Sequence, residues 1–219
     1  MALALDIPKL QEIIAYYKNG LQKNIIQIDL MFATKTDSKK NLYKTWMFKC
    51  CDQDIVDMAD ATLTNIYAST KKRSIDKYDL EVSTDETIQV IEEEKVVHYR
   101  ELRDAVTLDY SDDNVIKADM DFNKLDFLVM QLSDNGNQGA PQPTMTILKK
   151  YMKMPTKFNQ KGLKRYVFNG QEAKAFHKPM LIIGPNAEAF NLDGNFYILN
   201  RNYFNSMLKF KDIYCKVLD

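Results

Sequence analysis

The chain has 219 residues and carries 30 basic and 30 acidic side chains, so its formal net charge at pH 7 is zero. This length suits one domain and lets folding bury roughly 70% of the unfolded surface without help from disulfides or metal. Apolar residues make up 45% of the chain, which excludes a disordered or fibrous protein. Only seven glycines are present, which leaves little room for a glycine-rich phosphate-binding loop.

Apolar residues recur at two spacings along the chain. Spacings of three and four predict helices, and strict alternation predicts strands with one buried face. Helices come early and strands cluster late, which favours an α+β fold with a mostly antiparallel sheet and peripheral helices. The expected helices are 6–20, 52–69, 97–106 and 202–210, and the expected strands are 25–34, 42–50, 79–82, 87–91, 125–132, 144–148, 163–169, 176–183 and 195–199.

Particular residues predict how these elements begin and end. Asp6 is placed to cap the first helix, and Gly20 is placed to stop it. Residues 134–141 are the clearest loop in the chain, and residues 192–195 predict a short hairpin turn. The segment 125–132 is apolar at almost every position and therefore predicts a central strand.

We expect a single domain over residues 1–219, in which 1–75 form a helix–hairpin–helix subregion and 76–219 form the remaining core. Lys71, Lys72 and Arg73 are expected in an exposed loop after the second helix. The helices are expected to pack mainly against one face of the sheet. The expected core residues are Ile14, Ile28, Leu30, Trp46, Phe48, Leu63, Phe127, Val129, Ile182, Tyr197, Leu199 and Phe204.

Zero net charge conceals strong segregation along the chain. Residues 76–134 hold 17 acidic and six basic side chains, whereas residues 149–178 hold nine basic and one acidic. Tyrosines and phenylalanines are interleaved with these bases. Lysines neutralise phosphates and aromatic rings stack on nucleobases, so the basic segment predicts a DNA-binding surface directed at the phosphate backbone. The expected contact residues are Lys149, Lys150, Lys153, Lys157, Lys161, Lys164 and Arg165.

Other interpretations of the charge pattern stay open. The basic segment can instead pack against the acidic one, within the molecule or across an oligomer, which would make the chain a protein–protein scaffold. A third interpretation is a metal-dependent nuclease. In it the run 93–95 (Glu-Glu-Lys), with Asp79 or Asp85, would hold Mg²⁺ and orient a water.

Neither the cysteines nor the histidines predict a reactive centre. Cys50, Cys51 and Cys215 lack CxxC spacing, so we expect neither a structural disulfide nor a zinc site. His98 and His177 have no flanking nucleophile pattern and are expected to be structural or on the surface. We therefore expect no catalytic residue, no cofactor and no metal. No signal peptide or apolar run near the ~20 residues of a membrane span is visible, which predicts a cytoplasmic protein.

Several landmarks of the second half occur in a distinctive order. They are the run Val97–Leu102, the apolar strand 125–132, the run 180–183, the segment 190–200 with its Asp-Gly-Asn-Phe-Tyr-Ile-Leu-Asn ending, and Phe204 and Phe210. Over residues 85–219 this order resembles the KwaB-like family, the soluble component of the Kiwa bacterial anti-phage defence system. The resemblance implies a cytoplasmic defence protein that associates with DNA, often as an oligomer, and works beside a membrane-embedded partner. It transfers no catalytic residue.

Overall fold

The computed structural model describes residues 6–36, 42–48, 52–79, 81–106, 124–134, 142–153, 166–169, 172–175 and 181–210. The helices in these ranges are α1 (Ile7–Gln22), α2 (Asp52–Lys72), α3 (Tyr99–Val106) and α4 (Arg201–Leu208), with a short 3-10 turn η1 (Glu93–Lys95). The strands of the main sheet are β1 (Ile26–Lys35), β2 (Tyr43–Met47), β3 (Ser74–Lys77), β4 (Thr87–Glu92), β5 (Phe127–Asp134), β6 (Met145–Lys149), β11 (Ala189–Leu192) and β12 (Asn195–Ile198).

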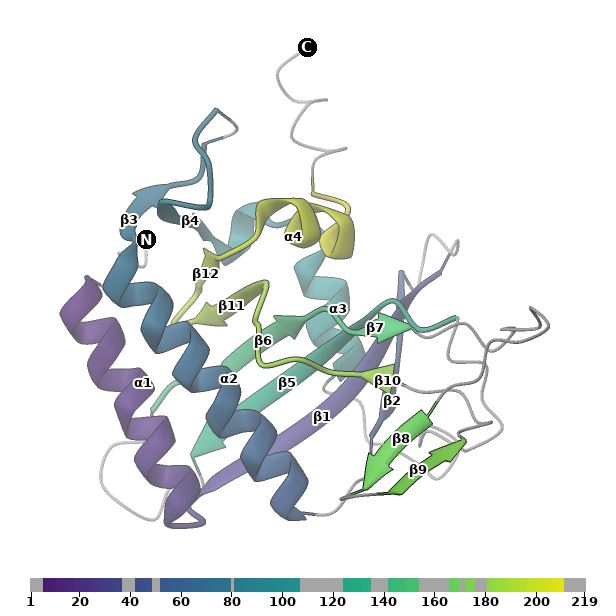
Figure 1. The fold of residues 1–219 in the computed structure, drawn as a ribbon. Helices are drawn as coiled ribbons and strands as arrows, with labels where there is room; N and C mark the ends of the chain where they lie inside the picture. The colour runs from purple at the N-terminus through teal and green to yellow at the C-terminus, as the bar shows by residue number, and fades with distance from the viewer. Residues whose placement is uncertain are drawn as a thin grey trace.

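The eight main strands form one sheet in the order β2-β1-β5-β6-β11-β12-β4-β3 (Figure 1). Neighbouring strands run antiparallel except β3 and β4, which are parallel. Two small pairs lie outside this sheet: β7 (Met152–Lys153) with β10 (Leu181–Ile182), and β8 (Tyr166–Asn169) with β9 (Glu172–Ala175). The expected α+β fold with a mostly antiparallel sheet is confirmed.

Helices cover both faces of the sheet, so the expectation that they pack mainly against one face is wrong. Helices α1 and α2 pack on one face with Leu30 and Phe32 of β1, and we call this the α1/α2 core. Helices α3 and α4 pack on the other face with Met31 and Ala33, and we call this the α3/α4 core. Because successive side chains of a strand point to opposite faces, one strand supplies both cores.

The N-terminal helix confirms one expected boundary and corrects the other. The Asp6 carboxylate accepts a hydrogen bond from the backbone N–H of Lys9 at 2.9 Å and so caps α1. Gly20 does not stop the helix, which continues to Gln22 before the chain turns at Asn24 with φ 54°. A Cβ on Gly20 would lie 2.6 Å from Cγ1 of Ile26, so glycine is needed there for close packing.

Helix α2 and the segment 74–82 also differ from the sequence expectation. Helix α2 extends to Lys72, so Lys71 and Lys72 belong to its last turn, where their positive charges favour the helix C-terminus. No strand forms at residues 79, 81 and 82, the described part of the expected strand 79–82. Strand β3 lies upstream, at the sheet edge and largely exposed, so its sequence lacks the apolar alternation that marks a half-buried strand.

Asp193 and Gly194 form the expected hairpin turn between β11 and β12, with φ of 50° and 73°.

Most of the expected core is buried. The expected core residues that are buried are Ile14, Leu30, Leu63, Phe127, Val129, Tyr197, Leu199 and Phe204. Ile28, Trp46 and Phe48 are partly buried against the α1/α2 core, and the side chain of Ile182 lies outside the described part.

The contact between Gly20 and Ile26 gives a stability prediction. Gly20→Ala should lower the free energy of unfolding by about 1 kcal/mol, because the overpacking cost exceeds the gain in helix propensity. Gly184→Ala is the matched control, since nothing lies within 4 Å of a Cβ added there. Urea denaturation of both variants measures the effect. A Gly20→Ala variant as stable as the Gly184→Ala variant would contradict the proposed contact.

Candidate nucleic-acid interface

The structure describes three of the seven basic residues expected to contact DNA. Lys149 ends β6, Lys150 follows it, and Lys153 ends β7. The side chain of Lys153 is outside the described part, as are all atoms of Lys157, Lys161, Lys164 and Arg165. The structure therefore bears on the side chains of Lys149 and Lys150, and the other five residues stay predictions.

Lys149 does not reach the surface, so its expected contact with phosphate is wrong. Its side chain is 0% exposed, and its Nζ donates a hydrogen bond to Oγ1 of Thr62 on α2 at 2.6 Å. The pleat of β6 explains the burial. Leu148 faces the α3/α4 core, and the next residue must then point to the α1/α2 core.

The charge on Lys149 is poorly compensated in this position. Burial lowers the pKa of Lys149 to about 8, against the opposing effect of the negative charge of Glu188. Glu188 is itself buried, and burial raises the pKa of its carboxyl, against the positive charges of Lys150 and Lys149. Lys149 and Glu188 are therefore part of the interior, where they affect stability rather than contact a ligand.

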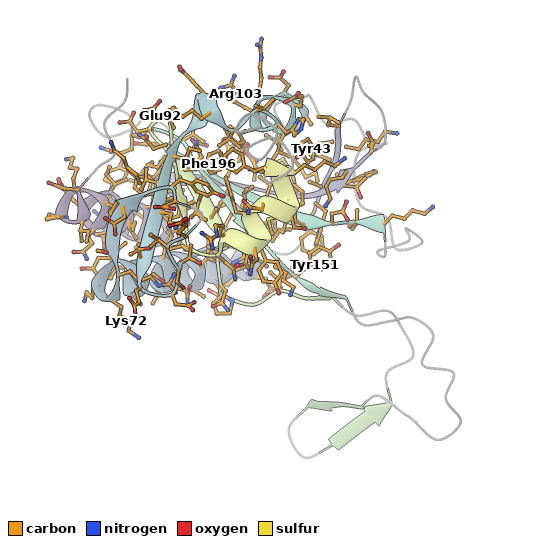
Figure 2. The ribbon with its side chains drawn as sticks, turned by 90° about the horizontal axis from the view of Figure 1, so that it is seen from above. Tyr43, Lys72, Glu92, Arg103, Tyr151 and Phe196 are labelled. Carbon is orange, nitrogen blue, oxygen red and sulfur yellow. The ribbon has the colours of Figure 1, made fainter. Side chains whose placement is uncertain are left out.

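Lys150 lines a cleft of about 360 Å³ at one end of the main sheet, which we call the α4 cleft. Strands β1 and β6 end here and β5 begins here, because β5 runs antiparallel to both. Helix α4 forms one wall, and Figure 2 shows Tyr151 close to this helix. The lining residues are Lys35, Asp126, Phe127, Lys150, Tyr151, Tyr203, Ser206 and Met207.

An aromatic ring holds the Lys150 side chain in the cleft. Its Nζ lies 4.0 Å from the centroid of the Tyr203 ring and also forms a hydrogen bond with the Tyr203 hydroxyl. A lysine ammonium over an aromatic face gains roughly 0.5–1 kcal/mol at an exposed site. The contact restricts Lys150 to the cleft while leaving its charge near solvent, since the residue is exposed.

Lys35 contributes a second ammonium group to the same cleft. Its Nζ donates a hydrogen bond to the backbone carbonyl of Ser206 at 2.9 Å, and its backbone N–H donates to Oδ2 of Asp126 at 2.7 Å. The ion pairs formed within the described ranges involve neither Lys35 nor Lys150. Among the described residues that line the cleft, Asp126 is the one carboxylate against two lysines, so these lining side chains carry a net positive charge.

Tyr151 forms the apolar floor of the cleft. Its ring packs edge-on against Phe32 with centroids 5.0 Å apart, and its hydroxyl donates to the backbone carbonyl of Leu125. Burial raises the pKa of the Tyr151 hydroxyl, and the charge of Asp126 raises it further. Tyr151 therefore stays protonated at physiological pH, and the cleft keeps its positive charge.

The run proposed for a metal nuclease is engaged in ion pairs. Glu93 Oε1 lies 2.6 Å from Nη1 of Arg103, and Lys95 Nζ lies 3.3 Å from Oε2 of Glu92. Figure 2 shows Arg103 well apart from Tyr151 and the α4 cleft. Within the described ranges, no group of three or more acidic, histidine or cysteine side chains is arranged to hold a metal ion.

The remaining candidate residues add no reactive site to the described structure. His98 is half-buried just before α3, with Nδ1 3.7 Å from Oε1 of Glu101 in that helix. His177 and all three cysteines lie outside the described residues. Across the described helices, none combines the length and the apolarity needed to cross a membrane.

The sequence did not predict a role for Lys35 and Tyr203, which line the α4 cleft together with Lys150. In the sequence, Lys35 follows the predicted strand 25–34, and Tyr203 is an aromatic residue of a short amphipathic helix. The two residues lie far apart in sequence, and the packing of α4 beside the ends of β1 and β6 brings them into one cleft. No local motif records that proximity.

Burial of Lys149 predicts a specific pH dependence of stability. Between its folded pKa of about 8 and the ordinary value of 10.5, the folded state binds fewer protons than the unfolded state, so the free energy of unfolding should rise with pH. Lys149→Met should remove a rise on the order of 1 kcal/mol between pH 7 and 9.5. Lys150→Met, at an exposed position, should retain it. Urea denaturation at several pH values tests this, and parallel curves for the wild type and Lys149→Met would refute it.

Comparison of the chain with protein-family models, with curated proteins and with solved structures found no match. A functional assignment must therefore be argued from the chemistry of the residues. In the described structure, two lysines and two tyrosines line the α4 cleft, and in the sequence the basic segment continues from Lys150.

Proposed function

We propose that this chain binds nucleic acid through backbone phosphates, with the α4 cleft as one part of the contact surface. The observation that carries the proposal is the pair Lys150 and Lys35, which share one cleft and form no ion pair with a carboxylate in the described part of the chain. Phosphate oxygens are the natural partners of such ammonium groups, and their binding releases condensed counterions. The Tyr203 ring adds a surface of the kind on which bases stack.

The sequence extends this surface beyond the cleft. Lys150 begins the run that continues with Lys153, Lys157, Lys161, Lys164 and Arg165. We propose that these residues contribute further phosphate contacts. Lysine outnumbers arginine in this run, which favours contacts with the backbone over the bidentate reading of base edges that arginine provides. The proposed binding therefore depends weakly on base sequence.

The biological setting of this proposal comes from the resemblance to the KwaB-like family. We propose a non-enzymatic anti-phage defence protein that acts in the cytoplasm as a homo-oligomer, beside a membrane-embedded partner. Phe196, Tyr197 and Phe204, which belong to the resembling segments, are buried. The defence role depends on the resemblance alone, and the gene neighbourhood tests it: an adjacent gene with several membrane spans is expected.

An oligomerisation scaffold is the alternative. The main sheet is open, with β2 at one edge and β3 at the other, and unpaired edge strands are sites at which another chain can add. The acidic segment 76–134 and the basic segment 149–178 could direct such an assembly. A scaffold and a DNA-binding protein respond differently to salt when size and DNA affinity are measured in the same buffers.

Salt dependence gives the direct test of DNA binding. The affinity for a duplex, measured by fluorescence anisotropy, should fall linearly with salt concentration on logarithmic axes, with a slope set by the number of phosphates neutralised. Lys150→Glu should reduce the magnitude of that slope by about one and weaken binding on every sequence alike. Reversing Lys161, Lys164 and Arg165 together should reduce it by about three.

The control is Lys23→Glu, which makes the same charge change at an exposed position after α1, at the opposite end of the molecule from the cleft (Figure 1). Its salt slope should equal that of the wild type. Absence of binding to duplex and single strands at low salt would exclude the proposal. An oligomer that dissociates as salt rises, without DNA affinity, would favour the scaffold. Mg²⁺-dependent cleavage lost in Glu94→Ala would favour the nuclease.

A further inference from the structure

A second cavity, of about 350 Å³, lies at the N-terminal end of α4, and we call it the arginine cavity. It shares no lining residue with the α4 cleft. Three parts of the chain meet there: the end of α2, the turn at residues 81–85, and the start of α4. Its polar lining side chains are Arg73, Glu81, Ser83, Thr84, Asp85, Asn200, Arg201 and Asn202.

The backbone fixes both guanidinium groups of this cavity. Nη1 of Arg73 donates a hydrogen bond to the carbonyl of Leu199 at 3.0 Å. Nη1 of Arg201 donates to the carbonyls of Asp79 and Val82, at 2.7 and 2.9 Å. Neither arginine forms an ion pair within the ranges that the structure describes. Backbone carbonyls thus hold both guanidinium groups in place, and neither group is within ion-pair distance of a described carboxylate.

The turn that receives Arg201 is anchored a second time. Nε2 of Gln89, a fully buried residue of β4, donates to the same carbonyls of Asp79 and Val82, at 2.7 and 2.9 Å. On the opposite side, the Asn200 side chain accepts the backbone N–H of Tyr203 and caps α4. The two arginines are therefore attached to elements whose own positions are fixed, so their geometry does not depend on a bound ligand.

We propose that the arginine cavity binds a phosphoryl group carried by a small molecule no larger than a nucleotide. Planar guanidinium groups present two parallel N–H donors to phosphate oxygens, and preorganised groups lose little entropy on binding. Two such groups match the several oxygens of a phosphoryl group better than the two oxygens of a carboxylate. The volume lies near the lower end of ligand pockets, roughly 300–1,000 Å³, which excludes a duplex.

The same cavity contains groups that oppose anion binding. Glu81 and Asp85 also line it, and both are exposed. Exposed carboxylates are solvated and screened, so they weaken an anion's binding without preventing it. This gives the proposal a distinctive signature. Replacing both by neutral amides, Glu81→Gln with Asp85→Asn, should tighten the binding of an anion inside the cavity.

Isothermal titration calorimetry on the full chain tests the proposal, with inorganic phosphate and adenosine 5′-monophosphate as probes and acetate as the carboxylate comparison. We expect saturable binding of both phosphates and at least fivefold weaker binding of acetate. Arg73→Gln should weaken phosphate binding about tenfold. Replacing Arg201 would remove its hydrogen bonds to Asp79 and Val82 and could disturb the turn. Asn202→Asp instead adds a carboxylate at an exposed lining residue and keeps those hydrogen bonds.

Asn202→Asp should also weaken phosphate binding about tenfold, whereas Gln22→Glu, the same charge change at the far end of α1, should alter it less than twofold (Figure 1). The double variant of Glu81 and Asp85 should bind phosphate at least threefold more tightly. No saturable phosphate binding, equal affinities of Asn202→Asp and Gln22→Glu, or acetate binding as tight as phosphate would each overturn the proposal.

Discussion

Burial of the sheet on both faces is the constraint on which the rest of this fold depends. Strands β6, β11 and β12 are buried at every position, β4 at all but its last, and β5 at five of its eight positions. Each strand must therefore supply apolar side chains to the α1/α2 core and to the α3/α4 core in alternation. A shift of one residue in the register would exchange the two sets, so the pairing of strands and the docking of helices specify one another.

The same alternation decides what each of two neighbouring lysines can do. Lys149 occupies a position that faces the α1/α2 core, where Thr62 provides a hydrogen bond and Glu188 a partial electrostatic compensation. Lys150, one residue later, lies on the α4 side and meets Tyr203. Burying an ammonium group costs free energy unless the group is well paired, so Lys149 depends on Thr62 and Glu188 and is not available to a ligand. Lys150 is exposed and can contact a ligand.

How far the sequence predicts this structure depends on the range of the interaction involved. Local signals worked: apolar spacing identified α1, and Asp193 with Gly194 identified the hairpin turn. The sequence did not predict contacts between segments that are distant along the chain. Glycine is needed at position 20 because Ile26 approaches it, whereas the sequence suggested a helix stop. Lys149 is buried because α2 covers it, whereas the sequence suggested a surface lysine. The α4 cleft was missed for the same reason, since β1, β6 and α4 form it together.

Helix α4 shows how a packed element positions two separate cavities. Its apolar side, with Phe204, Met207 and Leu208, is buried in the α3/α4 core, and the Phe204 ring lies 5.3 Å from that of Phe196. The polar positions are thereby distributed, with Arg201 at the arginine cavity and Tyr203 at the α4 cleft. Both cavities thus depend on the same apolar contacts, so only substitutions that leave these contacts intact can separate their functions.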